Sequence, residues 1–364
     1  MNPRIDPWGI EDIKNYRNLF DEFGIESFEK FRRKLSDNRY IRRGIIFGHR
    51  DFDKIMNSIQ KRESFVMMTG LMPSGKFHFG HKMVADQIIF YQEIGAEIFL
   101  CSADLEAYVV RGMDLETARN IATEEYLTNY MALGLKEKNL RFWFQTDYVT
   151  PYYRLRDMLS RKVTFNELNG IYGDLAPGKI FSVITQAADI LHPQLEEFGG
   201  PRPTVVPVGA DQDPHLRLTR DLASRFQTEF RFVLPSSTYH KFMRGLHGGK
   251  MSSSDPKSYI ALTDEPKKAI EKIMNAKTGG RATVDEQRKK GGIPEECMVY
   301  DLFLYHLIDD DKKLKRIYED CTSGERICGE CKANCAELTV EFLREHQKKR
   351  EKAKDVVDRI LRKK

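Results

Sequence analysis

The chain has 364 residues, 41% hydrophobic and 31% charged, which is typical of a folded globular protein and excludes a disordered one. It contains no apolar run as long as a membrane span, and its first residues lack the apolar core of a signal peptide, so we expect a cytoplasmic protein without a membrane partner. The whole net charge of +5 lies in Glu341–Lys364, where ten basic residues face five acidic ones. This segment could contact nucleic-acid phosphates or could be a solvated helix with its own ion pairs, and the sequence favours neither.

Residues 1–62 are predicted to form an N-terminal extension to the fold that follows. Within it, Asp21–Lys34 has a helical pattern, and Arg42–Phe47 has the pattern of a strand or a hairpin arm. On physical grounds alone, these elements could simply cover the edge of a sheet.

A strand, a tight loop and a helix follow one another from Phe65 to Lys82, FVMMTGLMPSGKFHFGHK. The apolar run at the start has no helical period and predicts a buried strand, and a helical pattern then continues until Gly95. The loop between them contains Gly70, Pro73, Ser74 and Gly75. A helix that begins after such a loop presents free N–H groups to a phosphate. His78 and His81 could donate hydrogen bonds to the same phosphate, and an ordinary turn with two incidental histidines is the alternative.

Acidic groups and two helices come next in the chain. A second strand ends near Cys101, and Asp104–Tyr108 follows it at the edge where open α/β sheets bind ligands. Helical patterns then cover about Asp114–Leu133 and Tyr152–Val163, in a segment that continues to Pro203.

A further helix in that segment contains QAADILHPQ, in which Gln186 and Asp189 share one face because they lie three residues apart. A carboxylate at Asp189 would accept a hydrogen bond from a substrate N–H or O–H. It could instead cap a neighbouring helix, and the residues alone leave both interpretations open.

The next apolar run, Thr204–Val208, leads into GADQDPH at Gly209–His215 and then into another helix. Gly248–Asp255, GGKMSSSD, is a polar loop with one lysine and three hydroxyl groups. A transfer at a phosphate needs such positioned charge and hydrogen-bond donors more than it needs covalent catalysis.

Charged helical patterns replace strands from Asp264 onward, so we place a domain boundary near Leu262–Lys267. The sequence therefore predicts an α/β protein with a Rossmann-like parallel sheet and an additional all-α domain. The predicted parts are the extension at 1–62, a catalytic domain at 63–262 with a helical connective insertion at about 104–203, and the helical domain at 263–364.

The order HFGH, then GADQ, then KMSSS resembles class I aminoacyl-tRNA synthetases, whose patterns are HIGH and KMSKS. From about Pro7 to about Asp355 the chain is similar to the archaeal tryptophanyl-tRNA synthetases, through RRGIIFGHRDFDKIM beside the ATP site, AADIL, and TGGRATVDEQRKKGG, TSGERICGECK and EHQKKREK in the C-terminal domain. The resemblance implies ATP-dependent activation of L-tryptophan and its transfer to tRNA(Trp), with release of AMP and diphosphate. It also implies a homodimer formed through the insertion and a C-terminal domain that binds the anticodon, and no DNA partner.

The resemblance assigns site residues by position. The implied catalytic residues are His78, His81, Lys250, Ser252 and Ser253. The implied ATP-binding residues are Pro73, Ser74, Gly75, Gly80, Gly209, Asp211 and Met251. The implied amino-acid-binding residues are Met68, Cys101, Glu106, Gln186, Asp189, Val206, Val208 and Gln212.

The chain departs from the family pattern at two places. KMSSS lacks the second lysine of KMSKS, so Lys250 would act alone. Met68 and Cys101 stand where many archaeal and eukaryotic members have a tyrosine and a glutamine. A tyrosyl-tRNA synthetase is the first alternative, but its archaeal members pair the aspartate with a tyrosine at the position of Met68. One acceptor in an apolar slot suits an indole, which has a single donor, so we favour tryptophan.

A metal site is predicted from the cysteines of the C-terminal domain. Cys297, Cys321, Cys328 and Cys331 have the spacing C-x23-C-x6-C-x2-C, which supplies the ligand count for zinc or a four-iron cluster, and free buried thiols are the alternative. Some tryptophanyl-tRNA synthetases carry a 4Fe-4S cluster on nearly this spacing. We also expect Mg²⁺ with ATP. Two other classes remain: an adenylyltransferase that uses no tRNA, and a synthetase-like protein without activity, which the intact motifs disfavour.

Overall fold

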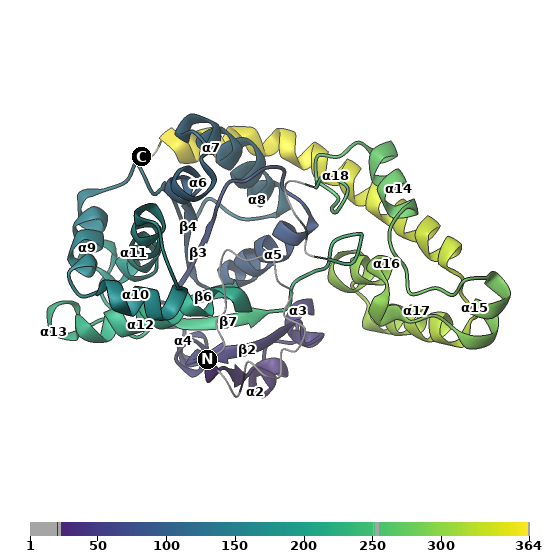
Figure 1. Cartoon of the computed structure of the whole chain (residues 1–364), viewed down its shortest axis with the longest axis horizontal. Coiled ribbons are helices and arrows are strands. Elements are labelled where there is room, and N and C mark those ends of the chain that lie inside the picture. Colours follow the sequence, from purple (N-terminus) through teal and green to yellow (C-terminus); the bar gives the residue numbers. More distant parts are fainter. Residues whose placement is uncertain (1–19, 21–22, 250, 252–254, 363–364) are drawn as a thin grey trace. The chain divides into compact units, whose positions relative to one another are not determined.

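The computed structural model describes residues 20, 23–249, 251 and 255–362 of the chain. The fold divides into two compact units (Figure 1). Unit 1 comprises the chain up to Ser74, Asp86–Lys241 and the end from Val356, and unit 2 comprises Gly75–Ala85 and Phe242–Asp355.

Unit 1 contains a seven-stranded sheet among the described residues, in the order β1-β2-β7-β6-β3-β4-β5. The strands are β1 Glu26–Ser27, β2 Ile46–Arg50, β3 Val66–Leu71, β4 Glu97–Ser102, β5 Leu140–Phe144, β6 Thr204–Gly209 and β7 Ser236–His240. The five strands β3 to β7 run parallel, while β1 and β2 are added antiparallel at one edge. The predicted α/β fold with a parallel sheet is confirmed.

The strand order reverses at β3, which pairs with β4 on one side and β6 on the other. Its first three residues, Val66, Met67 and Met68, are buried, as expected of a strand that is covered on both faces. The register places Gly70 beside Cys101, so the loops after β3 and β4 leave the sheet at the same end. The carboxyl ends of strands at such a reversal form the ligand crevice of open α/β sheets.

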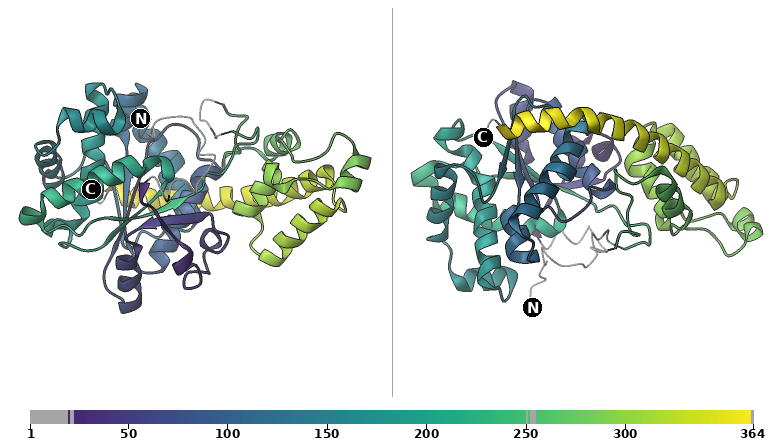
Figure 2. Two further views of the ribbon diagram at one scale, coloured as in Figure 1. Left: turned by 60° about the horizontal axis from the view of Figure 1, so that its bottom comes forward. Right: turned by 90° about the horizontal axis from the view of Figure 1, so that it is seen from above.

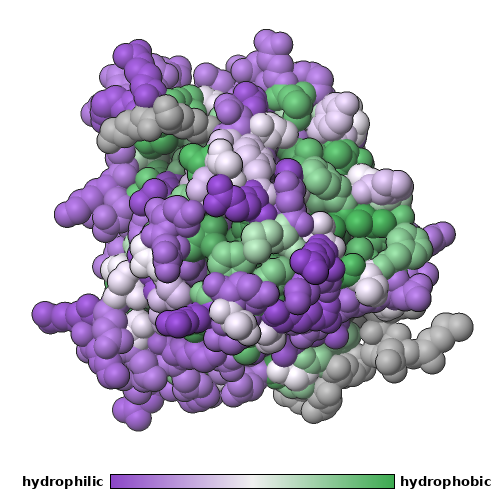
Figure 3. All heavy atoms as spheres, turned by 90° about the vertical axis from the view of Figure 1, so that its left-hand side faces the viewer, coloured by the Kyte–Doolittle hydropathy of each residue, from purple (hydrophilic) through white to green (hydrophobic). Residues whose placement is uncertain are grey.

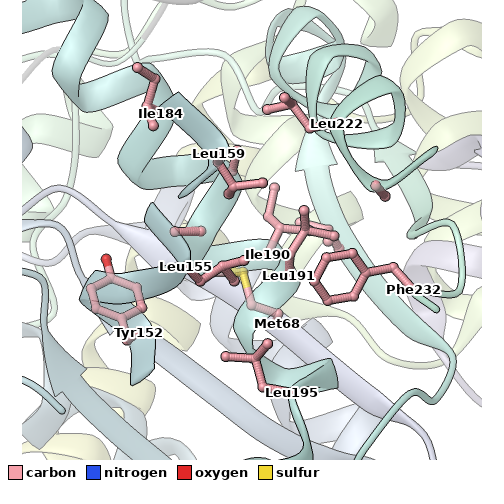
Figure 4. Close-up of a cluster of buried hydrophobic side chains, with 14 of the residues drawn as sticks. Met68, Tyr152, Leu155, Leu159, Ile184, Ile190, Leu191, Leu195, Leu222 and Phe232 are labelled. Carbon is pink, nitrogen blue, oxygen red and sulfur yellow. The ribbon is translucent and has the colours of Figure 1, made fainter. Parts of the chain in front are cut away.

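The helix α11, Pro177–Leu191, contacts β3, α6, α9 and α12. Its apolar residues join those of the neighbouring strands in a buried cluster, and Figure 4 shows Met68 of β3 within it, close to Ile190 and Leu191. The other helices of unit 1 are α2 Glu29–Arg32, α3 Arg39–Arg42, α4 Phe52–Lys61, α6 Asp104–Arg111, α7 Leu115–Ile121, α8 Thr128–Leu133, α9 Thr150–Ser160, α10 Phe165–Tyr172, α12 Asp213–Arg225 and α13 Gln227–Phe230. The helix α5, Phe79–Glu93, begins in unit 2 and ends in unit 1.

Unit 2 is helical in its described residues, apart from one isolated bridge between His78 and Ala261. Its helices are α14 Pro266–Met274, α15 Val284–Lys290, α16 Met298–Leu302, α17 Asp311–Ser323 and most of α18 Cys328–Arg362. The right-hand view of Figure 2 shows α18, in yellow, as one continuous helix. None of the helices described is both long and apolar enough to cross a membrane.

Three helix and strand predictions need correction. Of the described residues in Asp21–Lys34, Phe23 and Glu29–Arg32 are α-helical, and no helix runs between them because Gly24 turns the chain at φ 62° and the next residues pair with β2. Of the strand predicted at Arg42–Phe47, the first residue ends α3, whose N-terminus is capped by the Asn38 side chain. The helix predicted over Asp114–Leu133 forms, but its middle turns are π-helical.

Candidate active site

The histidine loop, Phe77–His81, lies in unit 2 at the start of α5. The rings of His78 and His81 stack with their centroids 3.8 Å apart. The backbone N–H of Gly80 donates to Nδ1 of His78 at 3.1 Å, and the backbone N–H of His78 donates to Nδ1 of His81 at 3.2 Å. Because both Nδ1 atoms accept, a neutral ring carries its proton on Nε2. Each ring therefore has an Nε2–H group to offer to a phosphate.

Burial keeps both imidazoles neutral at pH 7. It lowers the pKa of His81 to about 4. Burial, together with the nearby His81 and Lys272, lowers the pKa of His78 well below its usual value. The two rings can therefore stabilise developing phosphate charge as hydrogen-bond donors, without adding positive charge of their own.

Gly80 is a position where a side chain would not fit. A β-carbon there would lie 3.0 Å from Cε1 of His78 and 3.1 Å from Sδ of Met251. Both distances are tighter than ordinary van der Waals contact, so a larger residue would push against the histidine ring. Glycine at this position thus keeps the stacked pair in place.

The segment after the predicted KMSSS loop lies beside the histidine loop. The N–H of Phe79 donates to the carbonyl of Ile260 at 3.3 Å, and the N–H of Leu262 donates to the carbonyl of Phe77 at 2.8 Å. These bonds bring the end of the KMSSS region to the histidines within unit 2. The predicted residues Lys250, Ser252 and Ser253 lie outside the described residues.

A buried ion pair next to the histidines was not predicted from the sequence. Nζ of Lys272 lies 2.5 Å from Oδ2 of Asp264, and it also lies over the ring of Tyr259, which packs against His78. The charge of Lys272 is one of the influences that lower the pKa of His78. No motif marks this lysine, because it stands in an ordinary charged helix, α14.

The other predicted ATP-binding residues lie in unit 1, except Gly75, which begins unit 2. Pro73 and Ser74 follow β3, and Gly209 ends β6. Asp211 lies in the short 3₁₀ turn Ala210–Gln212 after β6. The chain next to this turn is anchored by Asp213, whose buried carboxylate accepts from the Arg50 guanidinium of β2 at 3.0 Å.

A second polar centre in unit 1 is formed around Asp189 of α11, which is 3% exposed. Its Oδ2 accepts from Nε2 of Gln145 at 2.6 Å, and its Oδ1 accepts from the hydroxyl of Tyr152 at 2.7 Å. The thiol of Cys101 points to the same Oδ1 at 3.6 Å. The donors come from β4, α9 and the end of β5, so three elements fix the direction of one carboxylate.

Burial is the main influence on the ionisation of this centre. It raises the pKa of Asp189 to about 7, against the lowering effect of the Tyr152, Gln145 and Cys101 hydrogen bonds. Burial and the nearby carboxylate raise the pKa of the Tyr152 hydroxyl and of the Cys101 thiol, so both remain donors. The centre can therefore hold one ionised acceptor near neutral pH.

The remaining residues predicted to bind the amino acid have different surroundings in unit 1. Met68 and Val206 are buried in the same apolar cluster, and Val208 packs against it. Figure 4 shows Met68 and Tyr152 within this cluster. Nε2 of Gln186 donates to Oε1 of Glu106 at 3.2 Å. Gln212 lies in the turn after β6.

Two residues of this centre, Gln145 and Tyr152, were missed at the sequence level. Tyr152 was predicted only as part of a helix, and Gln145 follows β5 without any motif around it. They stand 37 and 44 residues from Asp189 in the chain. The only signal available was that Gln145 follows a strand of the parallel sheet at its carboxyl end.

The predicted metal-binding cysteines lie together in unit 2. Cys297 and Cys331 are buried, and the pKa of Cys321 is raised to about 11 by burial and by the neighbouring Cys331, Cys297 and Cys328. Nε of Arg326 donates to Sγ of Cys331 at 2.8 Å. In the part of the chain that the structure describes, no group of three or more His, Cys, Asp or Glu side chains is arranged to hold a metal ion.

Two glycines leave the space beside these thiols open. A β-carbon at Gly280 would lie 2.6 Å from Sγ of Cys328, and one at Gly292 would lie 2.8 Å from Sγ of Cys321. Four neighbouring thiols with glycines beside them are compatible with a metal ion or a cluster. To bind one, the thiols would have to turn toward a common centre.

Comparison with known proteins finds relatives that match nearly the whole chain. Residues 60–344 match the family described as tRNA synthetases class I (W and Y). The chain is 54% identical to the tryptophan--tRNA ligase of Hyperthermus butylicus, over 97% of this chain and 96% of that protein. The crystal structure of the tryptophanyl-tRNA synthetase from Aeropyrum pernix K1 has a TM-score of 0.92 and 52% identity, and 98% of each chain is covered. The Encephalitozoon cuniculi enzyme, solved bound to tryptophan, has a TM-score of 0.83 and 26% identity, over 96% of this chain and 98% of that one.

The chain belongs to the class I tRNA synthetases of the tryptophan and tyrosine group. Within this group, each of the relatives named above is a tryptophan enzyme, from an archaeon or a eukaryote. The family predicted from HFGH, GADQ and KMSSS is confirmed.

Proposed function

We infer that the chain is a tryptophan--tRNA ligase, which activates L-tryptophan with ATP and transfers it to tRNA(Trp). The observation that carries the choice of amino acid is the single carboxylate of Asp189, held by three donors beside an apolar wall. A carboxylate has about four acceptor sites, so one can still accept the indole N–H. Met68 adds no hydrogen-bonding group for a phenol.

We propose that the histidine loop binds the phosphates of ATP. The tryptophan carboxylate would attack the α-phosphate, and diphosphate would leave with the electrons of the broken P–O bond. The Nε2–H groups of His78 and His81 would donate to the oxygens on which charge develops. The turn that follows Gly209 would hold the ribose, with Asp211 as an acceptor for a hydroxyl group. Mg²⁺ would enter with ATP and neutralise phosphate charge.

Amino-acid-dependent exchange of labelled diphosphate into ATP tests this function without tRNA. We expect exchange with tryptophan, and a kcat/KM for tyrosine lower by at least about 10²-fold, because Met68 gives a phenol hydroxyl no second hydrogen-bonding partner beside Asp189. Better exchange with tyrosine would make the chain a tyrosyl-tRNA synthetase. Exchange without transfer to tRNA would favour the adenylyltransferase alternative.

We propose that residues 263–364 bind the anticodon region of tRNA. The support is the basic end of α18, where Lys349 and Lys354 pair with Glu345 and Glu351 only at exposed positions. Such exposed pairs are worth little, so these lysines can exchange their partners for RNA phosphates. The cytoplasm is where this tRNA would be charged.

We also propose that the chain forms a homodimer through α9, α10 and α11. Val149, Phe165 and Phe181 are 42%, 58% and 39% exposed, and α9 borders a depression of about 540 Å³ lined by Tyr153 and Met158. Figure 3 views unit 1 from this side and shows a broad hydrophobic area among polar residues. Exposed apolar areas of this kind mark protein interfaces.

The dimer can be tested by sedimentation of the full chain. Phe165→Glu should shift it toward the monomer, whereas Val284→Glu, at an equally exposed residue of α15, should not. A monomeric wild-type chain would contradict the proposal.

A metal or 4Fe-4S cluster in unit 2 is a further part of the proposed function. Cys297, Cys321, Cys328 and Cys331 would hold it, and when bound it would cross-link three separate segments of the helical domain. Arg326 would donate a hydrogen bond to the sulfur of Cys331 and so stabilise its thiolate form. Protein purified without oxygen should contain iron with acid-labile sulfide, or about one zinc per chain. Metal-free protein with four freely titratable thiols in this domain would remove the hypothesis.

A further inference from the structure

A second pocket in unit 1 lies away from Asp189, between α2, α3, the start of β2 and the end of β7. It has a volume of about 370 Å³. Three cationic side chains line it, those of Arg32, Arg43 and Lys241, together with one acidic side chain, Glu29. Among the described residues, the lining of the pocket thus carries more positive than negative side chains.

Lys241 is the cation of this pocket whose charge is not balanced by any acidic side chain among the described residues. Its side chain is half-buried, and burial together with the nearby Arg32 lowers its pKa. No ion pair or hydrogen bond of its ammonium group is found among the described residues, and its backbone N–H is bonded to the carbonyl of Ile45 at 3.0 Å. A half-buried charge that faces another cation is costly, and a bound anion would offset that cost.

The two arginines lie on neighbouring parts of the extension, Arg32 in α2 and Arg43 directly after α3. Nε and a terminal nitrogen of Arg32 donate to the carbonyl of Arg42 at 2.9 and 2.6 Å, which ties the guanidinium to the end of α3. Arg32 also pairs with Glu29 at 3.1 Å, but this carboxylate is 71% exposed and such a pair is weak. Gly44, at φ 64°, then turns the chain into β2 directly after Arg43. The Arg32 guanidinium is therefore held in place at the pocket by contacts within the chain.

The sheet register places this pocket near the reaction. His240 pairs with Gly209 of β6 on one side and with Ile46 of β2 on the other, and Lys241 is the next residue. Neighbouring strands are about 5 Å apart, so the pocket begins one strand away from the turn that would hold the ribose. The pocket lies at the carboxyl end of β7, and the turn lies at the carboxyl end of β6.

We propose that this pocket binds a backbone phosphate of the single-stranded acceptor end of tRNA. This inference rests on the proposed function, because the terminal adenosine must reach the activated amino acid and its preceding phosphates must then lie nearby. Lys241 and Arg43 supply the contacts to the phosphate, and Arg32 holds the end of α3 in place. Contacts of this kind set position and affinity without reading sequence.

The test compares Lys241→Gln and Arg43→Gln with Lys61→Gln, a matched change at the exposed end of α4, in the full chain. We expect each pocket variant to raise the KM for a tRNA(Trp) transcript about fivefold and to reduce the slope of log KM against log salt by about 1. Exchange of diphosphate into ATP, which needs no tRNA, should stay at the wild-type rate. The Lys61 variant should behave as wild type in both assays.

Unchanged tRNA KM and salt slope in both pocket variants would overturn the proposal. A raised KM for ATP in the exchange assay would also overturn it, because the pocket would then serve an ATP phosphate. Should Lys241→Gln lower the thermal midpoint, the result for Arg43→Gln decides the test. Failure of wild-type exchange with tryptophan would instead refute the proposed function, so the two failures are distinguishable.

Discussion

The carboxylate of Asp189 in unit 1 and the imidazoles of His78 and His81 in unit 2 are alike in one respect: each is buried, and burial is the largest influence on its pKa. They differ in how they are held. Asp189 is oriented by side chains of three elements that lie far apart in the chain. The histidines are held by backbone N–H groups of their own turn and by stacking.

From this difference we expect Asp189 to act in tryptophan binding and the two histidines to act in the chemical step. The pKa and the direction of a carboxylate that is held by distant side chains can be changed by substitutions at any of them. We expect loss of this carboxylate to weaken tryptophan binding. Rings held by a local turn depend on that turn alone, and we expect their loss to slow the chemical step. The four predictions below test this separation.

The largest effect is expected for His81→Ala. Losing one preorganised donor to the transferring phosphate typically costs about 3–4 kcal/mol, so exchange turnover should fall by about 10²- to 10³-fold. The dissociation constant of tryptophan should stay within about twofold. Because the native ring is neutral, His81→Gln should restore part of the rate. A wild-type rate for His81→Ala would refute the role of this ring.

A smaller effect is expected for Asp189→Asn. The amide can still accept the indole N–H, but the bond is no longer charge-assisted, so tryptophan binding should weaken by about 1–2 kcal/mol. Calorimetric titration with tryptophan measures this loss, and the KM for ATP is the control. Equal weakening of ATP binding would show that the two centres are not separate in function.

The pH dependence of tryptophan binding should follow Asp189. Because its pKa is raised to about 7, the ionised acceptor is lost as pH falls, and the KM for tryptophan should rise about fivefold between pH 7 and pH 6. The same raised pKa means that the folded state binds this proton more tightly than the unfolded chain, so its contribution to stability decreases as pH rises toward 7. A KM that is flat in the wild type, or that still rises in Asp189→Asn, would contradict the assignment.

The smallest effect is expected for Tyr152→Phe. Removing a hydroxyl that donates to Asp189 should cost about 1 kcal/mol in tryptophan binding. It should also move the pH inflection of KM upward, because this hydrogen bond lowers the pKa of the carboxyl. Tyr153→Phe is the matched control, since its hydroxyl accepts from the N–H of Tyr148 instead. The same shift in both variants would point to general loosening of α9.

The contrast also explains what the sequence could predict. The histidine loop is organised by neighbours within four residues, so HFGH is readable as a motif, and the strand before it is marked by its apolar run. Asp189 was found in the same way, through AADIL. Its partners Gln145 and Tyr152 were not, because only the folded sheet and α9 bring them to the carboxylate.

Other misses have equally specific causes. The helical pattern of Asp21–Lys34 was overridden by a turn at Gly24 and by pairing of Glu26 and Ser27 with β2. The cap of α3 was present in the sequence as Asn38 but was not used. The pair of Lys272 and Asp264 lies eight residues apart, which is no helical contact spacing, so nothing local marks it.

The antiparallel strand β2 has a consequence for shortened versions of the chain. It covers β7, whose five residues Ser236–His240 are all buried. A chain cut after Arg50 would leave one row of β7 peptide groups unsatisfied along an edge without charged side chains, which is a template for edge-to-edge aggregation. If such a truncated chain were insoluble, the cause would therefore be the exposed edge of β7 and not the loss of a catalytic group.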